Sequence, residues 1–516
     1  MRSVPKLLSA DTHGISAHLV RVEADLGVGL HSFQIVGLAD KAVSEAKERV
    51  SSALKHCGAR PPSRDNHRIT VNLAPADVKK SGSRFDLPIA LAYLLASEQL
   101  SSFPLEDSIF LGELSLDGAL RPVPGVLNVA LLAREEKIST LYVPQENASE
   151  AALLPELRVF PVSSLSELIA HLEGREAIAP QPRTSFSPSF SPSAHPLSHV
   201  RGLRAAKRAL LVAASGGHHL FLSGPPGTGK TMLAQTLSSL LPPPDLEEGI
   251  EITRIYSSVG LLGKNPIWTC RPFRNPHHSA SFAALIGGGT DPRPGEISLA
   301  HRGVLFLDEA PEFRRDALEA LRQPLEAGEV HVSRVKGTLS FPARFMLILA
   351  MNPCPCGYFG DVSQACQCTA REVFRYQKKI SGPLLDRIDI QIEVPRTPLE
   401  ELRDAHSDKT GANEDEIFRE AVSRARKRQS DRFGAAGLAF RANAEMSSNA
   451  TERFAKLHSS AEELLRRMLK GSFISTRGYY RILKIARTIA DLDASDEVSA
   501  DHLGEAFQYR LKESRI

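Results

Sequence analysis

Short apolar runs alternate with longer helical patterns along the first 174 residues. Apolar and β-branched residues form strand-like runs at 19–22, 33–36, 69–73, 109–114 and 140–143. Apolar residues recur at helical spacing over 39–57, 87–100 and 126–135. Short strands that alternate with helices are typical of mixed α/β structure. The pattern therefore predicts a small α/β domain over residues 1–174.

The second half of the chain changes from alternating strands and helices to helices alone. Apolar strand-like runs and helical patterns alternate at 219–223, 231–241, 303–307, 314–327 and 344–350. This is the order of βαβ units, so we expect an α/β core with a parallel sheet over 198–396. Beyond it, helical patterns follow one another at 416–432, 459–470, 477–492 and 500–510. These patterns predict an α-helical lid over 397–516.

Residues 175–197 separate the two regions. Pro and Ser displace any apolar periodicity there, most densely in the run Ser-Phe-Ser-Pro-Ser-Phe-Ser-Pro-Ser at 185–193. Such a composition is typical of a linker. We therefore expect a flexible connection between the N-terminal domain and the α/β core.

Composition excludes several classes of protein. The chain has 516 residues, of which 42% are hydrophobic and 24% charged, as in an ordinary globular protein. No run approaches the ~18 apolar residues of a membrane span, and the first residues lack a signal-peptide pattern, so we expect a cytosolic protein without a membrane partner. The net charge of +3 is too small to indicate nucleic-acid binding by itself.

A glycine-rich loop follows the strand-like run at 219–223. Its residues are Gly224, Pro225, Pro226, Gly227, Thr228, Gly229, Lys230 and Thr231. At this spacing backbone N–H groups surround phosphates, Lys230 meets the β/γ charge and the Thr231 hydroxyl holds Mg²⁺. A chance glycine turn is a poor alternative between a strand and a helix. The loop predicts a site for ATP and Mg²⁺.

Polar residues also end the two later strands. After the run 303–307, Asp308 suits the Mg²⁺ shell and Glu309 suits polarisation of the attacking water. Solvated acids at a strand edge are the alternative, but a place about 80 residues after the phosphate loop favours catalysis. Asn352 follows the apolar run 345–351, where its amide can orient water near the γ-phosphate. An Asn turn before Pro353 is the alternative there.

Two later arginines are candidates for contact with the γ-phosphate. Arg387 can stabilise transition-state charge from a neighbouring subunit, as an arginine finger does. Its alternative is a surface ion pair with Asp386 or Asp389. Arg477, at the start of a helical pattern, is a candidate second sensor, and Arg481 one turn later is its rival.

Four of the six cysteines are clustered in the sequence. They are Cys354, Cys356, Cys366 and Cys368. Four thiolates can hold structural Zn²⁺, although C-x-C pairs are tighter than the usual spacing of zinc ligands. Reduced cysteines in an ordered loop are the alternative.

These motifs, in this order, resemble the AAA+ ATPases. The runs at 271–279, 284–289, 294–309 and 381–389 are similar to the magnesium-chelatase-like branch, and the whole chain resembles its ComM/YifB family. The resemblance implies a homo-hexameric ring with ATP at subunit interfaces and Arg387 acting in trans. It also implies a DNA helicase that drives branch migration of recombination intermediates, notably in natural transformation.

The same resemblance suggests further contacts. In this branch a β-hairpin precedes the first sensor, and residues 329–341 alternate like a hairpin that turns near 336–337. Arg334 and Lys336 are then candidates for contact with DNA phosphates, with solvated hairpin charges as the alternative. Val200 and Gly202 match the family segment before the phosphate loop, so we assign the adenine pocket to them.

The N-terminal domain resembles the ribosomal-S5-like fold shared with Lon protease. The runs at 80–92 and 111–125 carry this similarity. Proteolysis would need a Ser nucleophile and a Lys base, but Asp86 and Leu127 occupy the aligned positions. We therefore expect a binding or assembly module.

The sequence leaves three functions open. The leading one is an ATP-driven translocase on single-stranded or branched DNA. The alternative is an ATPase of magnesium-chelatase type that remodels a protein, because fold does not fix substrate. A protease is disfavoured by the missing Ser/Lys pair.

Overall fold

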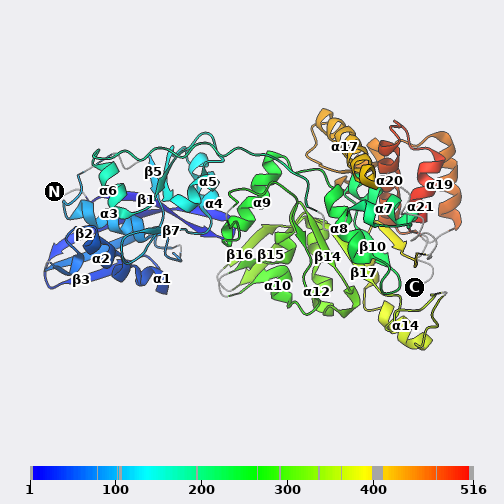
Figure 1. Cartoon of the computed structure of the whole chain (residues 1–516), viewed down its shortest axis with the longest axis horizontal. Helices are drawn as coiled ribbons and strands as arrows, with labels where there is room; N and C mark the ends of the chain where they lie inside the picture. Colours follow the sequence, from blue (N-terminus) through cyan, green and yellow to red (C-terminus); the bar gives the residue numbers. More distant parts are fainter. Residues whose placement is uncertain are drawn as a thin grey trace. The chain divides into compact units, whose positions relative to one another are not determined.

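The computed structural model describes residues 4–510 except 65, 78, 102, 104–106, 193–195, 264, 290–291, 335–336, 362, 398–410 and 472–473. The chain divides into two compact units (Figure 1). Unit 1 comprises residues 1–187 and 249–268, and unit 2 comprises 188–248 and 269–516. The chain passes from unit 1 to unit 2 between residues 187 and 188, within the Pro/Ser-rich segment 175–197. The inclusion of 249–268 in unit 1 was not predicted.

Unit 1 is built on a 7-stranded sheet in the order β3-β4-β2-β1-β5-β8-β9. Its strands are β1 (Lys6–His13), β2 (Ser16–Val28), β3 (Ser32–Val36), β4 (His67–Ala74), β5 (Ser108–Phe110), β8 (Thr140–Pro144) and β9 (Arg158–Val162). The β1–β2 and β2–β4 pairs are antiparallel, and the other pairs in the sheet are parallel. Alternate residues of β4, such as Ile69, Val71 and Leu73, are fully buried, as period-2 patterning predicts.

The helices of unit 1 pack on this sheet. They are α1 (Lys41–Ser44), α2 (Ala46–His56), α3 (Asp86–Ala96), α4 (Val126–Glu135), α5 (Gln145–Ala151) and α6 (Leu165–Leu172), with the short pair β6 (Glu113–Leu114) and β7 (Leu120–Arg121) between α3 and α4. Helix α3 is buried from Asp86 to Leu94. An all-round apolar helix belongs in a core, so this helix anchors the domain.

Helix α9 (Leu246–Ser258) explains why unit 1 includes a later segment. The Ser257 hydroxyl donates to buried Glu150 at 2.6 Å, and the Arg254 Nε donates to the Asn128 amide oxygen at 3.2 Å. Ile250 also packs on the hydrophobic core around α4. Residues inserted between the phosphate-loop helix and the next strand therefore belong to the N-terminal core.

Unit 2 contains a 5-stranded parallel sheet in the order β11-β14-β17-β10-β18. The strands are β10 (Leu220–Ser223), β11 (Phe273–Arg274), β14 (Val304–Leu307), β17 (Met346–Met351) and β18 (Ile390–Glu393). Strands β14 and β17 are buried along their whole length. Continuous apolar strands of this kind are typical of parallel sheets covered on both faces. The predicted α/β core with a parallel sheet is confirmed.

Short elements surround this sheet. They are α7 (Arg204–Gly216), α8 (Lys230–Leu240), α10 (Phe282–Ile286), β12 (Gly287–Gly288), β13 (Arg293–Pro294), α11 (Glu296–Leu299), α12 (Arg315–Ala320), α13 (Arg322–Ala327), α14 (Ala370–Gln377) and α15 (Gly382–Leu385). The predicted helix at 314–327 is divided between α12 and α13.

The C-terminal region is helical, as predicted. Its helices are α17 (Gly411–Ala435), α18 (Ser448–Phe454), α19 (Ser459–Gly471), α20 (Thr476–Leu492) and α21 (Ala500–Gln508). Buried residues of α17, α20 and α21 share one hydrophobic cluster with α7, α8 and the sheet. The helical region therefore packs on the parallel-sheet core within unit 2 (Figure 1).

Strands β15 (Glu329–Arg334) and β16 (Gly337–Pro342) form the predicted hairpin. Their antiparallel register runs from Glu329 opposite Pro342 to Arg334 opposite Gly337. Lys336 and the side chain of Arg334 lie outside the described residues. The hairpin is confirmed, and the two DNA contacts stay predictions.

The Pro/Ser-rich segment makes contacts that its composition did not predict. The Thr184 N–H donates to the Ala152 carbonyl at 3.0 Å within unit 1. The Ser189 N–H donates to the Thr269 carbonyl at 2.8 Å within unit 2. Backbone hydrogen bonds thus fix parts of a segment whose sequence indicated only flexibility.

Among the described residues, none of the helices is both long and apolar enough to cross a bilayer.

Candidate functional site

The glycine-rich loop connects β10 to α8 and turns through two left-handed glycines. Gly227 has φ 79° and Gly229 has φ 83°, a region that other residues adopt only with strain. Gly224 is required for a different reason, because a Cβ there would lie 2.2 Å from the Val394 carbonyl oxygen. The loop therefore keeps its shape only with glycine at these positions. It presents the N-terminus of α8, where free N–H groups favour phosphate.

Lys230 points back into the loop. Its ammonium group donates to the carbonyls of Gly224 at 2.7 Å and Pro225 at 2.8 Å, and to the Asn352 amide oxygen at 3.1 Å. Burial lowers the pKa of Lys230 to about 8, although the charges of Asp308 and Glu309 oppose that shift. Asn352, from the end of β17, thus reaches the phosphate loop.

The lowered pKa of Lys230 predicts a pH dependence of nucleotide binding. Phosphate binding needs the ammonium form, and its population falls from about nine-tenths to about one-tenth between about pH 7 and about pH 9. We expect the dissociation constant of a fluorescent ATP analogue to rise about tenfold over this range. Lys230→Arg is the matched control, because a guanidinium stays charged and should remove the pH slope. If the dissociation constant depended equally on pH in the wild type and in Lys230→Arg, the role of Lys230 as the titrating phosphate-binding group would be contradicted.

Thr231 and Asp308 meet at the same edge of the sheet. The Thr231 hydroxyl donates to the Asp308 carboxylate at 2.6 Å. Asp308 follows β14, and the carboxyl ends of parallel strands lie together. A hydroxyl and a carboxylate are oxygen ligands of the kind that Mg²⁺ prefers, so the pair fits a Mg²⁺ site with phosphate ligands.

Glu309 is held in an uncommon backbone conformation. Its φ of 50° and ψ of 45° are left-handed, and its side chain is 55% exposed. Non-glycine residues in this region carry strain that is characteristic of functional sites. The carboxylate lies 3.7 Å from Nδ1 of His278, so His278 is also part of the candidate site. His278 belongs to the run 271–279, but its sequence position did not identify a contact with Glu309.

Arg387 and Arg477 converge on one carboxylate. Arg387, whose side chain is only 5% exposed, donates to Glu326 at 2.6 Å. Arg477 lies 3.1 Å from the same Glu326 and is 59% exposed. Arg481 is used differently, since it donates to buried Asp389 at 2.8 Å and to the Arg387 carbonyl. Arg477 is therefore better placed than Arg481 to meet a ligand.

These arginines lie at the edge of the sheet opposite the phosphate loop. Strand β18 pairs in parallel with β10, with Leu220 opposite Ile390 and Ser223 opposite Glu393. Arg387 precedes this ladder and the phosphate loop follows it, so the four residues of β10 separate them by about 13 Å at about 3.3 Å per residue. Arg387 thus lies beyond the other end of the ladder from the phosphate loop of its own chain.

A cavity of about 790 Å³ lies on this opposite side of unit 2. Its lining includes Glu326, Arg344, Arg477 and Arg481, and no residue of the phosphate loop. The cavity is thus distinct from the nucleotide site of the chain.

The segment assigned to adenine precedes α7. Val200 is 1% exposed and joins the core cluster, and Gly202 has a left-handed φ of 62°. These positions make a fixed turn before α7. Their contact with adenine stays a prediction.

The N-terminal domain has no catalytic Ser/Lys pair at the aligned positions. Asp86 is fully buried and accepts from Arg49 at 2.6 and 2.9 Å. Burial raises the pKa of Asp86 to about 6, which the Arg49 hydrogen bonds and charge oppose. Leu127 is buried in the hydrophobic core. These contacts are those of a packed domain core.

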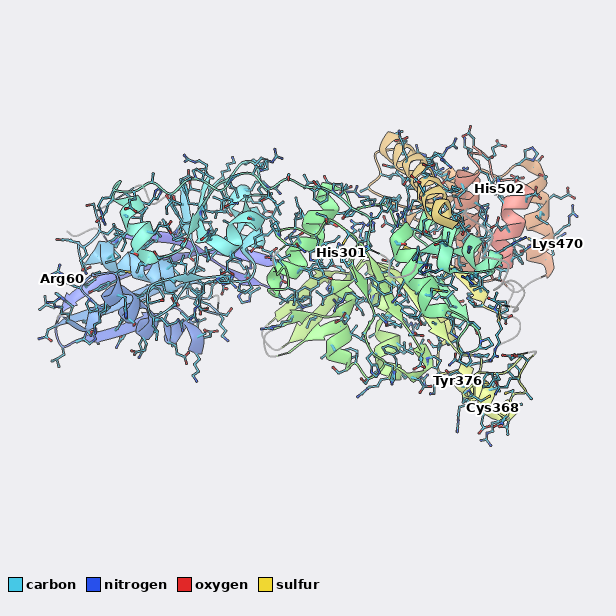
Figure 2. The ribbon with its side chains drawn as sticks, in the orientation of Figure 1. Arg60, His301, Cys368, Tyr376, Lys470 and His502 are labelled. Carbon is cyan, nitrogen blue, oxygen red and sulfur yellow. The ribbon has the colours of Figure 1, made fainter. Side chains whose placement is uncertain are left out.

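The four clustered cysteines come together after β17. The sulfur atoms of Cys354, Cys356, Cys366 and Cys368 lie within 4.8 Å of one another, and all are free thiols. Figure 2 marks Cys368 in the loop that leads to α14. The chemistry of this donor set fits a soft metal ion.

Family models match three parts of the chain. The model described as magnesium chelatase, subunit ChlI, matches residues 196–402. The model of subunit ChlI of Mg-chelatase matches 22–147, and that of the ChlI C-terminal region matches 413–510. The three matches follow the order of the N-terminal domain, parallel-sheet core and helical region.

Curated relatives match nearly the whole chain. Competence protein ComM of Haemophilus influenzae is 42% identical over 514 residues, covering 98% of this chain and 97% of that protein. Uncharacterized protein YifB of Escherichia coli is 42% identical over 498 residues, covering 96% and 95%. Lon protease of Rhizobium meliloti is 26% identical over 167 residues, covering 30% of this chain and 20% of that protein.

Proposed function

Since the chain belongs to the magnesium-chelatase-like AAA+ family of ComM and YifB, we propose that it is an ATP-driven, hexameric DNA helicase or translocase. Its role would be branch migration of recombination intermediates, in natural transformation and homologous recombination. The observation that carries this proposal is the 42% identity to a competence protein over 98% of the chain. Membership of this family implies ATPase activity.

Hydrolysis follows from the residues at the carboxyl edge of the parallel sheet. The loop N–H groups and Lys230 bind the phosphates, and Mg²⁺ held by Thr231 and Asp308 would neutralise their charge. Glu309 accepts a proton from the attacking water, and Asn352 orients that water. All these groups lie at one edge of the parallel sheet, which supports their action on a single bound nucleotide.

The proposed site is completed by a neighbouring subunit. Arg387 and Arg477 share Glu326, and Arg387 lies beyond the end of the β10–β18 ladder that is opposite the phosphate loop, which supports contact with a nucleotide held by another chain. In a closed ring each subunit would contribute its loop to one interface and these arginines to the next. This arrangement supports hydrolysis that depends on assembly.

DNA contact is assigned to the hairpin. Arg334 and Lys336 belong to the β15–β16 segment, and cations on a ring's inner hairpins can bind phosphates whatever the base sequence. We also propose that the protein acts in the cytoplasm, where such intermediates occur. Zn²⁺ is the proposed occupant of the four-cysteine group.

DNA should stimulate ATP hydrolysis. We expect the steady-state rate to rise several-fold with a four-way junction at low salt, and to lose this increase as salt weakens phosphate contacts. Combined Arg334→Ala and Lys336→Ala changes should remove the stimulation, whereas Arg466→Ala with Arg467→Ala on α19 should retain it. A rate unaffected by single-stranded, duplex and branched DNA would contradict the proposal.

A protein-remodelling ATPase is the second candidate. The observation that favours it is the match of all three regions to models of a magnesium chelatase subunit. This candidate predicts ATP hydrolysis that a protein partner stimulates and DNA does not. Capture of a partner by the Glu309→Gln variant, with no binding of DNA, would support it.

A further inference from the structure

The strongest unexplained feature is the four-cysteine group immediately after Asn352. Among the first three cysteines the sulfur atoms are 3.3 Å apart for Cys354 and Cys356, 3.5 Å for Cys356 and Cys366, and 3.7 Å for Cys354 and Cys366. The sulfur of Cys368 lies within 4.8 Å of the other three. A tetrahedral zinc with Zn–S bonds of about 2.3 Å would separate its sulfur ligands by about 3.8 Å. A disulfide would need about 2.05 Å. The group therefore has the size of a metal site.

Backbone N–H groups also point at the sulfur atoms. The Phe359 N–H donates to Cys354 at 3.3 Å, and the Cys368 N–H donates to Cys366 at 3.4 Å. Such outer hydrogen bonds stabilise metal-bound thiolates and orient them. Cys354 is fully buried, so the loop closes over its first ligand.

We propose that the four thiolates bind one Zn²⁺ and that this centre holds residues 353–368 against the phosphate loop. Binding converts four thiols into four coordinated thiolates and releases four protons to solvent, with no change of oxidation state. Four protein ligands leave no open position, so the metal is structural.

The cysteine loop contacts the phosphate loop directly. Gly357, with a φ of 89°, lies so close that a Cβ on it would be 2.7 Å from Cδ of Pro226. The residue before Pro226 supplies one of the carbonyls that hold Lys230. Metal ligands therefore stand on both sides of Gly357 in the loop. Their coordination determines how Gly357 packs against the phosphate-binding backbone.

A second connection runs through Asn352. Its amide accepts from Lys230, and only Pro353 separates it from the first cysteine ligand. The Pro353 carbonyl accepts from Gln377 of α14 at 3.0 Å. The metal centre therefore fixes both the position of the sensor amide and the shape of the phosphate loop. This coupling rests on the proposed ATP site, whereas metal binding does not.

Metal content tests the first part of the proposal. The full chain, purified without chelator, should contain about one Zn²⁺ per chain, measured by elemental mass spectrometry. Cys366→Ser with Cys368→Ser should reduce zinc to background, and Cys57→Ser with Cys270→Ser, which lie outside the group, should retain it. Cobalt added to metal-free protein should give the absorption of tetrahedral thiolate coordination. Absence of both zinc and cobalt signals in the wild type would overturn the metal site.

A pair of glycine substitutions tests the coupling. Gly357 and Gly360 both have positive φ, but a Cβ on Gly360 would meet no atom within 4 Å. We expect Gly357→Ala to keep its zinc and bind a fluorescent ATP analogue about tenfold more weakly, because displacement of a positioning element is costly. Gly360→Ala carries similar backbone strain and should bind like the wild type.

The outcomes separate this proposal from the proposed function. Equal nucleotide affinity for both glycine variants, or loss of zinc from Gly357→Ala, would overturn the coupling. Zinc content and nucleotide affinity are both measured without DNA, so failure to process DNA would leave these results unchanged. A wild-type chain that holds zinc but binds no nucleotide would instead contradict the proposed ATP site.

Discussion

Replacing Arg387 by Ala is expected to lower the turnover number for ATP hydrolysis about 10³-fold. An arginine that stabilises transition-state charge from a neighbouring subunit contributes a factor of this order. Arg387 lies beyond the end of the β10–β18 ladder that is opposite its own phosphate loop, which favours action on a neighbour's nucleotide. Its pairing with Glu326 holds the guanidinium ready at that edge. Steady-state ATPase assays of the assembled variant measure the effect, and ATP affinity should fall far less than turnover.

Mixed assemblies test the action in trans. Arg387→Ala subunits added to wild type should depress hydrolysis more steeply than the loss of wild-type subunits explains, because each variant also disables a neighbour's site. The matched control is Arg467→Ala, which changes an exposed arginine paired with Glu463 on α19. Subunits with this change should leave the hydrolysis rate of the mixture unaffected. Activity proportional to the wild-type fraction in the Arg387→Ala mixture would refute the trans assignment.

Glu309→Gln is expected to lower turnover by about 10²-fold or more while nucleotide remains bound. The amide keeps the size of the side chain but cannot accept the proton of the attacking water, and general bases contribute factors of about 10²–10⁴. Glu309 has a left-handed backbone, and its carboxylate lies 3.7 Å from Nδ1 of His278. Single-turnover hydrolysis and binding of a fluorescent ATP analogue separate chemistry from affinity.

Glu312→Gln is the matched control for this experiment. Glu312 lies three residues after Glu309 in the same short segment that follows β14, and its side chain pairs with Lys379 at 3.3 Å. Its loss should leave turnover within about twofold, since surface ion pairs contribute little. An equal loss of turnover in Glu309→Gln and Glu312→Gln would show that hydrolysis depends on the negative charge of the segment rather than on Glu309 as the base.

Local sequence signals predicted the glycine-rich loop between a strand and a helix. The phosphate loop depends on glycines and on its own backbone, so its shape follows from neighbouring residues alone. Asn352 was expected near the γ-phosphate, and its amide oxygen accepts from Lys230, the residue expected to meet the β/γ charge. The hairpin at β15 and β16 likewise follows from local alternation.

Other features depend on contacts that no local pattern encodes. Glu326 lies 61 positions before Arg387 and joins it only through the fold. Strand β1 was missed because Ser9 and Asp11, although polar, are fully buried. Ser9 donates to the Phe110 carbonyl and Asp11 accepts from the Ser81 N–H, which satisfies both groups inside the core. Hydrophobic alternation cannot reveal such a strand.

The grouping of residues 249–268 with the N-terminal domain has the same origin. Ser257 and Glu150 are 107 positions apart, and their hydrogen bond requires both folded segments. Composition placed the domain boundary at the Pro/Ser-rich segment. The chain also passes between the two units at both ends of 249–268, where composition gives no signal. The close approach of Gly357 to Pro226 was also invisible in sequence, because each glycine or proline alone suggests only a turn.

ATP hydrolysis is expected to drive this chain along branched DNA. The most direct measurement incubates the assembled protein with ATP, Mg²⁺ and an end-labelled four-way junction at low salt, and follows the labelled strands by native electrophoresis. We expect the wild type to convert the junction into two-stranded products, and Glu309→Gln to bind the junction and leave it intact. A wild-type protein that hydrolyses ATP but neither binds nor converts the junction would contradict the claim.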